Sequence, residues 1–268
     1  MANSYPSAVG EDGIAHVPQV TRSSGEMSGA EWSARLELAA CYRAIEMFGW
    51  SALTGNHISL RVPGEDGCFL LNEFGLTYRE VTASNLVKVD LDGRIVGEVA
   101  RPVNYAGFVI HSAVHRAREE AHCVLHTHTI EDNAVSALEE GLLSLNQQSA
   151  MFAGQVAYHD YEGPALSMDE QVRLQEDLGD KPLMILRNHG MLAVGGSVSE
   201  AFLLTYHFQI ACRMQLATLS CGRPFRVVTG KAEQAAAQLF TRYRKTTPNQ
   251  SWEAIRRRVD IEQPGYRA

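Results

Sequence analysis

The sequence predicts a single α/β domain with a mixed or mainly antiparallel sheet and helices on both faces. Helix-like and strand-like segments interleave along the 268 residues, and no internal repeat or linker divides them. Two short hairpin patterns near the start favour antiparallel pairing. A chain of this length can bury a substantial core as one large domain.

Composition narrows the class of protein and of partner. Hydrophobic residues make up 45% of the chain and charged residues 21%, which is typical of a soluble globular protein. The net charge of −7 disfavours nucleic acid and anionic membrane surfaces as partners, and no apolar run is long enough to cross a bilayer. Five cysteines, an odd number without a CxxC pair, favour the reducing cytoplasm.

The first third of the chain is expected to contain an arm, a helix and two hairpins. Residues 1–30 are rich in Ser, Gly and Pro and are expected to form a loosely attached arm. Residues 31–50 carry an apolar stripe at helical spacing. Residues 57–72 read as two strands around "PGEDG", and residues 86–97 as a second hairpin around Asp92-Gly93.

In the middle of the chain, the spacing of the apolar residues changes from a strand pattern to a helical pattern and then returns to a strand pattern. Residues 104–118 form a predicted helix with Asn104 at its start. The run "CVLH" from Cys123 is a short buried strand, and Thr129 is placed to cap the helix that follows.

The remaining segments alternate in the same way. Ser167 precedes Glu170, and Ser197 precedes Glu200, at the spacing of a capping box. The predicted elements are a strand at 154–161, a helix at 167–179, two strands within 182–196, a helix at 197–219, and two amphipathic helices from 231 joined near Pro248.

Three histidines are candidate metal ligands. His126 and His128 are two residues apart at a strand end, so their side chains point the same way. His189 sits in an Asn-His-Gly turn after a buried strand, where Gly190 would allow a positive φ. Three imidazoles with an open fourth position are typical of a catalytic metal, and Zn, Fe, Co, Ni or Mn would suit them.

Other polar residues offer weaker alternatives. His111 and His115 share one helical face and could also hold a cation, although packing on the sheet explains them better. His57 and His159 are isolated and are more often structural or exposed. In "GNHIS", Asn56 and Ser59 beside Gly55 could form a small anion or substrate cradle, or only a turn.

The order of these motifs resembles the class II aldolase/adducin superfamily. The resemblance covers about residues 32–225 and rests on "GNHISLRV", "NYAGFVIHSAVHRA", "VLHTHT" and "ILRNHGMLAVGGSVSEAF". The segments "AGFVIHSAVHRA" and "ILRNHGM" resemble the adducin head domain and its bacterial relatives more than the sugar-phosphate aldolases.

The resemblance implies a three-layer α/β/α domain over residues 31–230 with a mainly antiparallel sheet, as well as a homotetramer and a small-molecule substrate. The two amphipathic helices from residue 231 are expected to form a helical extension at 231–268 packed on this domain. A divalent metal, Zn before Fe(II), Mn, Co or Ni, would be held by the residues His126, His128 and His189. Substrate contacts would fall on the residues Gly55, Asn56, Gly75 and Asn104.

The sequence departs from the pattern of the aldolases at two places. Their acid/base glutamate belongs to a segment that here reads Val103-Asn104-Tyr105-Ala106-Gly107, without a carboxylate. Their tyrosine from a neighbouring subunit falls near Gln147-Gln148. A proton-transfer group would then come from bound water, Tyr105, His111 or His115.

Three functions follow as hypotheses. The first is a metal-dependent lyase or isomerase that stabilises the enolate of a small hydroxy-carbonyl substrate, sugar-like or keto-acid-like. The second is an Fe(II)-dependent oxygenase or decarboxylase of a 2-keto or hydroxy acid on the same scaffold. The third is a non-catalytic oligomerisation module like the adducin head; without adducin's lysine-rich tail, actin or spectrin binding is not expected.

Overall fold

One seven-stranded sheet organises the chain. The computed structural model describes residues 27–97, 101–246 and 248–268. The strands lie in the order β3-β2-β1-β4-β7-β6-β5. Their bounds are β1 His57–Arg61, β2 Cys68–Leu71, β3 Val87–Asp90, β4 Cys123–Thr127, β5 Val156–His159, β6 Leu183–Leu186 and β7 Gly190–Gly195.

The sheet is mainly antiparallel, which confirms the predicted fold class. Neighbouring strands pair antiparallel except β5 and β6, which run parallel. The first predicted hairpin is confirmed as β1–β2. The second is confirmed only in part, because a single bridge joins Val89 to Ile95 beyond β3. The Asp90 carboxylate accepts the backbone N–H of Asp92 and of Arg94, which closes this turn without a second strand.

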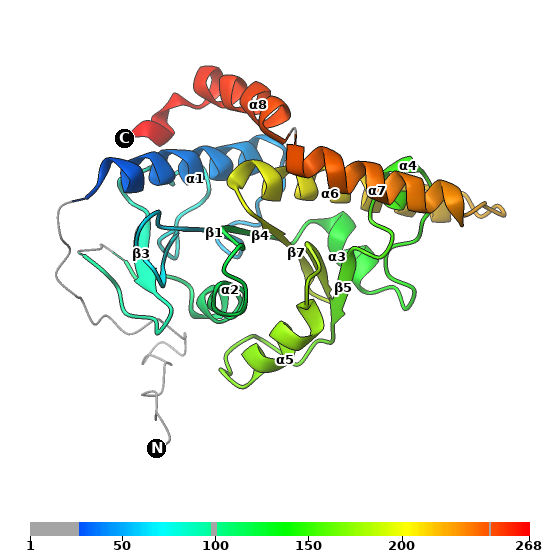
Figure 1. Ribbon diagram of the computed structural model, residues 1–268, viewed down its shortest axis with the longest axis horizontal. Coiled ribbons are helices and arrows are strands. Elements are labelled where there is room, and N and C mark those ends of the chain that lie inside the picture. The colour runs from blue at the N-terminus through cyan, green and yellow to red at the C-terminus, as the bar shows by residue number, and fades with distance from the viewer. Residues whose placement is uncertain (1–26, 98–100, 247) are drawn as a thin grey trace.

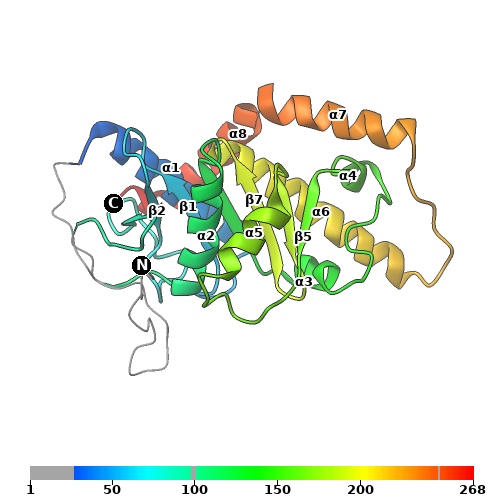
Figure 2. The same ribbon diagram turned by 60° about the horizontal axis from the view of Figure 1, so that its bottom comes forward.

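Helices cover both faces of the sheet, so the domain has three layers (Figure 1). Helices α1, α6 and α8 lie on one face and α2 and α5 on the other (Figure 1). Helix α7 runs along α4 and α6 (Figures 1 and 2). The helix bounds are α1 Gly29–Met47, α2 Tyr105–Ala117, α3 Ile130–Ser136, α4 Gln147–Ala150, α5 Glu170–Leu178, α6 Val198–Ser220, α7 Lys231–Thr246 and α8 Pro248–Glu262, followed by the 3₁₀ turn Pro264–Arg267.

Side-chain caps start three of the helices where the sequence predicts them. Asn104, Thr129 and Ser197 each accept a backbone N–H of the first turn. The capping box expected at Ser167 is wrong, because the Ser167 hydroxyl accepts the N–H of Asp169 in a local turn and α5 begins only at Glu170. The short helix α4 was not expected.

Two apolar layers hold the three-layer structure together. One lies between the sheet and the α1 and α6 face, with Leu38, Leu125 and Phe208 among its buried members. The other lies under α2 and α5, with Phe108 and Leu174 among its members. Because strand side chains alternate between faces, strands β2, β4, β6 and β7 contribute buried apolar residues to both layers.

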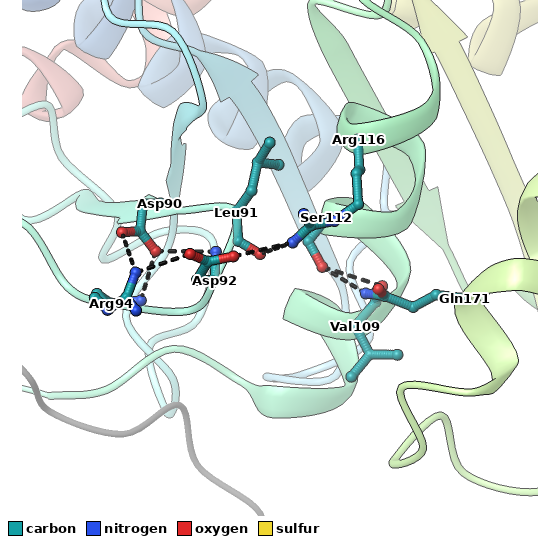
Figure 3. Close-up of polar contacts among 8 residues, drawn as sticks. All are labelled: Asp90, Leu91, Asp92, Arg94, Val109, Ser112, Arg116 and Gln171. Carbon is teal, nitrogen blue, oxygen red and sulfur yellow. Dashed lines mark hydrogen bonds and ion pairs between the residues drawn. The ribbon is translucent and has the colours of Figure 1, made fainter. Parts of the chain in front are cut away.

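Polar contacts fix α2 between the β3 turn and α5 (Figure 3). The Arg116 guanidinium donates to the Leu91 carbonyl at 2.7 Å. From the other side, the Gln171 amide donates to the Val109 carbonyl and to the Ser112 hydroxyl, both at 2.7 Å. These contacts set the rotation of α2 and therefore the face that carries His111 and His115.

Two expectations concern regions outside this core. The predicted N-terminal arm falls almost wholly on residues 1–26, outside the described residues. The described helices include none that is long and apolar enough to cross a membrane.

A buried carboxylate links β4, α3 and α6. The Asp132 carboxylate accepts hydrogen bonds from the Thr127 hydroxyl at 2.6 Å and the Gln209 amide at 2.7 Å. Burial raises the pKa of Asp132 to about 6, although these two bonds act in the opposite direction. A raised carboxyl pKa means that the folded state binds a proton more readily than the unfolded chain.

The contribution of Asp132 to stability is therefore fully present below about pH 4 and is lost as the pH rises through about 6, a loss of about 3 kcal/mol. Asp132→Asn removes this dependence and keeps an oxygen for Thr127 and Gln209. In urea unfolding, the free energy of unfolding of the variant relative to the wild type should be about 2 kcal/mol higher at pH 7.5 than at pH 4.5. The exposed Asp180→Asn is the control, and a constant difference between Asp132→Asn and wild type would contradict the prediction.

Candidate metal centre

Three histidines meet where β4 ends and β7 begins. His126 is on β4, His128 follows the strand, and His189 lies in the turn between β6 and β7. One ring nitrogen of each lies within 4.8 Å of the others, and His126 is fully buried while the other two are partly accessible. The structure thus brings together the three residues that the sequence singles out.

The ring orientations suit a cation. The His126 Nδ1–H donates to the Met191 carbonyl at 2.7 Å, which turns its Nε2 lone pair toward the other two rings. The Nε2 atoms of His126 and His128 are 2.5 Å apart. A zinc ion with bonds of about 2.0–2.1 Å would hold two such nitrogens about 3.3 Å apart in tetrahedral geometry, a small adjustment.

Burial keeps this centre electrically neutral. It lowers the pKa of His126 well below the usual histidine range and that of His128 to about 4, with the neighbouring imidazoles adding to the effect. The pKa of His189 is lowered by burial as well. Neutral imidazoles are the form that binds a divalent cation, so these residues fit a resident metal.

The Asn-His-Gly turn uses two positions with positive φ. Gly190 has the positive φ that the sequence suggests, at 158°, and Asn188 has a left-handed φ of 55°. Gly190 is needed for space: a Cβ there would lie 2.3 Å from the Thr127 carbonyl oxygen and 3.1 Å from His128 Cδ2. The close approach of β7 to the end of β4 brings His189 to the other two rings.

The expected substrate residues are only partly gathered at this centre. A Cβ on Gly55 would point to His128 Nδ1 at 3.9 Å, so this loop borders the candidate ligands. The neighbouring Asn56 donates to the Trp50 carbonyl, and its Oδ1 is buried without a hydrogen-bond partner. Asn104 uses its side-chain oxygen to cap α2, and Gly75 lies in the loop after β2 with φ 89°.

A row of buried polar side chains continues from the candidate ligands toward α2. His57 stacks on His126, with ring centroids 4.9 Å apart. From His57 the row passes to His111 at 2.8 Å, then to Ser59 at 2.5 Å, and from Ser59 to His115 at 2.7 Å. Sequence reasoning missed this row, although the i, i+2 spacing of His57 and Ser59 places both on one strand face.

The row changes the interpretation of three residues. Ser59 is fully buried and bonded to two imidazoles, so it is not available to a substrate cradle. Burial lowers the pKa of His111 well below its usual range and that of His115 to about 3, so both are neutral. Within the described residues, His111 and His115 form no metal cluster of their own.

Tyr105 and His159 are two further buried residues that the sequence singles out. Tyr105 is 5% exposed and packs near Phe108 at the start of α2. His159 is buried, bonded through Nδ1 to Asp177 at 2.7 Å, and its Nε2 lies 3.6 Å from the Glu170 carboxylate. A cavity of about 10 Å³ is lined by His159, Glu170 and His189 among others, so the Glu170 carboxylate, which the sequence did not suggest, shares a small cavity with one candidate ligand.

Comparisons with known proteins agree with this architecture. The family described as class II aldolase and adducin N-terminal domain matches residues 36–216. The crystal structure of an aldolase II superfamily protein from Pseudomonas syringae is 43% identical, superposes with a TM-score of 0.87, and the match covers 91% of this chain and 98% of that one.

Two relatives represent the two halves of the family name. Alpha-adducin from Rattus norvegicus is 48% identical over 198 residues, which is 72% of this chain but 27% of the adducin. An L-fuculose 1-phosphate aldolase from Glaciozyma antarctica PI12 is 25% identical with a TM-score of 0.76, over 91% of this chain and 97% of the aldolase. The identity to the adducin is therefore the higher of the two.

The contact at Gly190 gives a test of how the candidate ligands are positioned. In Gly190→Ala, the new methyl group meets the Thr127 carbonyl, so β7 must move away from β4 and His189 must move with it. We expect a loss of about 1–3 kcal/mol in unfolding free energy and a Zn²⁺ affinity about 10–100-fold lower, measured by competition with a chromogenic chelator. Gly29→Ala, at an open position, is the control; unchanged Zn²⁺ affinity in Gly190→Ala would contradict the expectation.

Proposed function

The chain belongs to the class II aldolase and adducin family, and from that premise we propose that it is a metal-dependent lyase or isomerase of a small hydroxy-carbonyl compound. The observation that carries the proposal is the group of three neutral imidazoles within 4.8 Å of one another. We propose His126, His128 and His189 as the ligands, and Zn²⁺ as the ion before Fe²⁺, Mn²⁺, Co²⁺ or Ni²⁺.

The chemistry would be stabilisation of a developing enolate. A divalent cation held by neutral ligands keeps its full charge and polarises a carbonyl oxygen, the step shared by aldol cleavage and epimerisation. The residues of the chain would orient the ion and the substrate. The Met191 carbonyl fixes the His126 ring, and the unpartnered Asn56 Oδ1 near Gly55 offers an acceptor for a substrate hydroxyl.

Substrate class follows from the relatives and from the borders of the centre. The fuculose-phosphate aldolase relative supports a hydroxy-carbonyl substrate, such as a short sugar or a keto acid. Gly55 and Asn56 support binding of a small polar molecule, and Gly75 and Asn104 are proposed to complete the substrate side. Assembly as a homotetramer is part of the same proposal.

Metal analysis with ligand variants tests the proposal. The protein purified without chelators should carry about one divalent ion per chain, and His128→Ala should lose it because two imidazoles remain. Turnover over a panel of short hydroxy-ketones, sugar phosphates and keto acids should fall about 100-fold or more in that variant. His122→Ala, which removes an exposed imidazole at the opposite end of β4, should keep both metal and turnover.

The same panel separates the other two functions. Oxygen consumption that requires Fe²⁺ and a keto acid would identify an oxygenase instead of a lyase. Absence of any metal, together with no turnover over the whole panel, would contradict the proposal and favour a non-catalytic module like the adducin head.

A further inference from the structure

The row of imidazoles beside the candidate ligands has a fixed hydrogen-bond direction. It begins at the Ala121 carbonyl, which lies 2.9 Å from His115 Nδ1 and can accept a hydrogen bond but not donate one. His115 Nδ1 must therefore carry the proton. Because His115 is neutral, its Nε2 carries a lone pair and no proton. The Ser59 hydroxyl, 2.7 Å away, must therefore donate to this nitrogen.

The direction passes from Ser59 to His57. With its proton committed to His115, the Ser59 oxygen accepts at 2.5 Å from His111 Nδ1–H. The neutral His111 then has a lone pair on Nε2, which accepts from His57 Nδ1–H at 2.8 Å. One tautomer remains for a neutral His57: a proton on Nδ1 and a lone pair on Nε2.

The His57 ring lies beside the candidate ligand His126. His57 is the antiparallel partner of His126, and their rings stack with an interplanar angle of 26°. Within the described residues, no hydrogen bond to His57 Nε2 is found, and this atom is not among the fully enclosed ones without a partner. It also stands outside the group of ligand nitrogens within 4.8 Å of one another.

A glycine on α2 makes room for this ring. A Cβ on Gly107 would lie 2.6 Å from His57 Cδ2 and 2.9 Å from His57 Nε2. Any side chain at position 107 would therefore enter the space that the imidazole fills. Gly107 is the last residue of the segment Val103-Asn104-Tyr105-Ala106-Gly107, where this chain has no carboxylate. The imidazole of His57 therefore occupies the space that a side chain from this part of α2 would fill.

We propose that His57 is the proton-transfer residue of this centre, with Nε2 as the proton acceptor, held in that tautomer by His111, Ser59, His115 and the Ala121 carbonyl. The inference rests on the proposed lyase function. In cleavage of a β-hydroxy-carbonyl compound, Nε2 takes the hydroxyl proton, the O–H pair forms the new carbonyl as the carbon–carbon bond breaks, and the electrons of that bond become an enolate. The imidazolium then returns the proton to the enolate carbon, so the histidine is regenerated.

The tautomer can be tested without turnover. Histidine ring ¹⁵N spectra of the Zn²⁺-loaded and metal-free protein should show His57, His111 and His115 protonated at Nδ1, with signals assigned from single variants. Ser59→Ala should release His111 and His57 from this tautomer, because the direction is no longer transmitted. A wild-type His57 protonated at Nε2 would overturn the proposal.

The proton-transfer role is tested by exchange. Dihydroxyacetone in D₂O, followed by ¹H NMR with the Zn²⁺-loaded protein, should exchange its carbon-bound hydrogens. His57→Ala should slow this exchange about 10²–10⁴-fold. Its Zn²⁺ affinity should fall by less than the 10–100-fold that loss of a group supporting a ligand brings.

The outcomes separate this inference from the function on which it rests. Exchange by the wild type that persists in His57→Ala would overturn the role of His57 and leave the lyase standing; loss of exchange in Glu170→Gln instead would assign the role to that carboxylate. A collapse of Zn²⁺ affinity in His57→Ala would make His57 a ligand and overturn the proposal. No exchange by the loaded wild type, with dihydroxyacetone, glycolaldehyde or hydroxypyruvate, would overturn both.

A double variant distinguishes proton transfer at this position from a purely structural role of His57. In His57→Ala with Gly107→Glu, a carboxylate enters the vacated ring space from α2. Restored exchange in this double variant would support proton transfer at that position. Exchange that stays absent although the double variant binds Zn²⁺ would overturn the placement of the proton acceptor.

Discussion

The antiparallel register of β1 against β4 is the constraint on which the candidate centre depends. It sets His57 opposite His126 and Ser59 opposite Val124, so the polar side chains of β1 lie on the sheet face under α2. A shift by one residue would turn His57 and Ser59 into the apolar layer under α1 and α6. The same shift would place Ile58 and Leu60 against the imidazoles of α2. Register is thus enforced from both sides, by apolar burial on one face and by hydrogen bonds on the other.

Burial of so many imidazoles on one face has a cost that the structure offsets in two ways. A buried imidazole must stay neutral or find a counter-charge, and a neutral ring still needs a donor and an acceptor. Around α2 this need is met internally, since Ser59 accepts from one imidazole and donates to the next while the Ala121 carbonyl terminates the row. At the end of β4 the Nε2 atoms of His126 and His128 lie 2.5 Å apart, and a cation between them and His189 would satisfy all three rings.

Local rules account for what the sequence predicted, and long-range pairing accounts for what it did not. Strand alternation and the Asn-His-Gly turn were enough to select His126, His128 and His189, and short-range capping gave the starts of α2, α3 and α6. The row through His57 depends on which strands pair and in which register, and no local pattern encodes that. At Ser167 the capping-box spacing is misleading, because the hydroxyl accepts the nearer backbone N–H of Asp169 instead of capping α5.

The pairing of His57 with Gly107 bears on how one scaffold can change its chemistry. Replacing either residue alone is unfavourable: a side chain at 107 collides with the ring, and loss of the ring leaves a void beside His126. The two positions therefore form a coupled choice between an imidazole from the sheet and a side chain from α2 in the same space. The choice of imidazole in turn requires a partner for Nδ1, which His111 supplies, and His111 requires Ser59. Exchanging the imidazole beside the metal centre for another side chain would therefore also change what the other residues of the row must do. The row through Ser59 and His115 is in this sense a consequence of placing His57 beside His126.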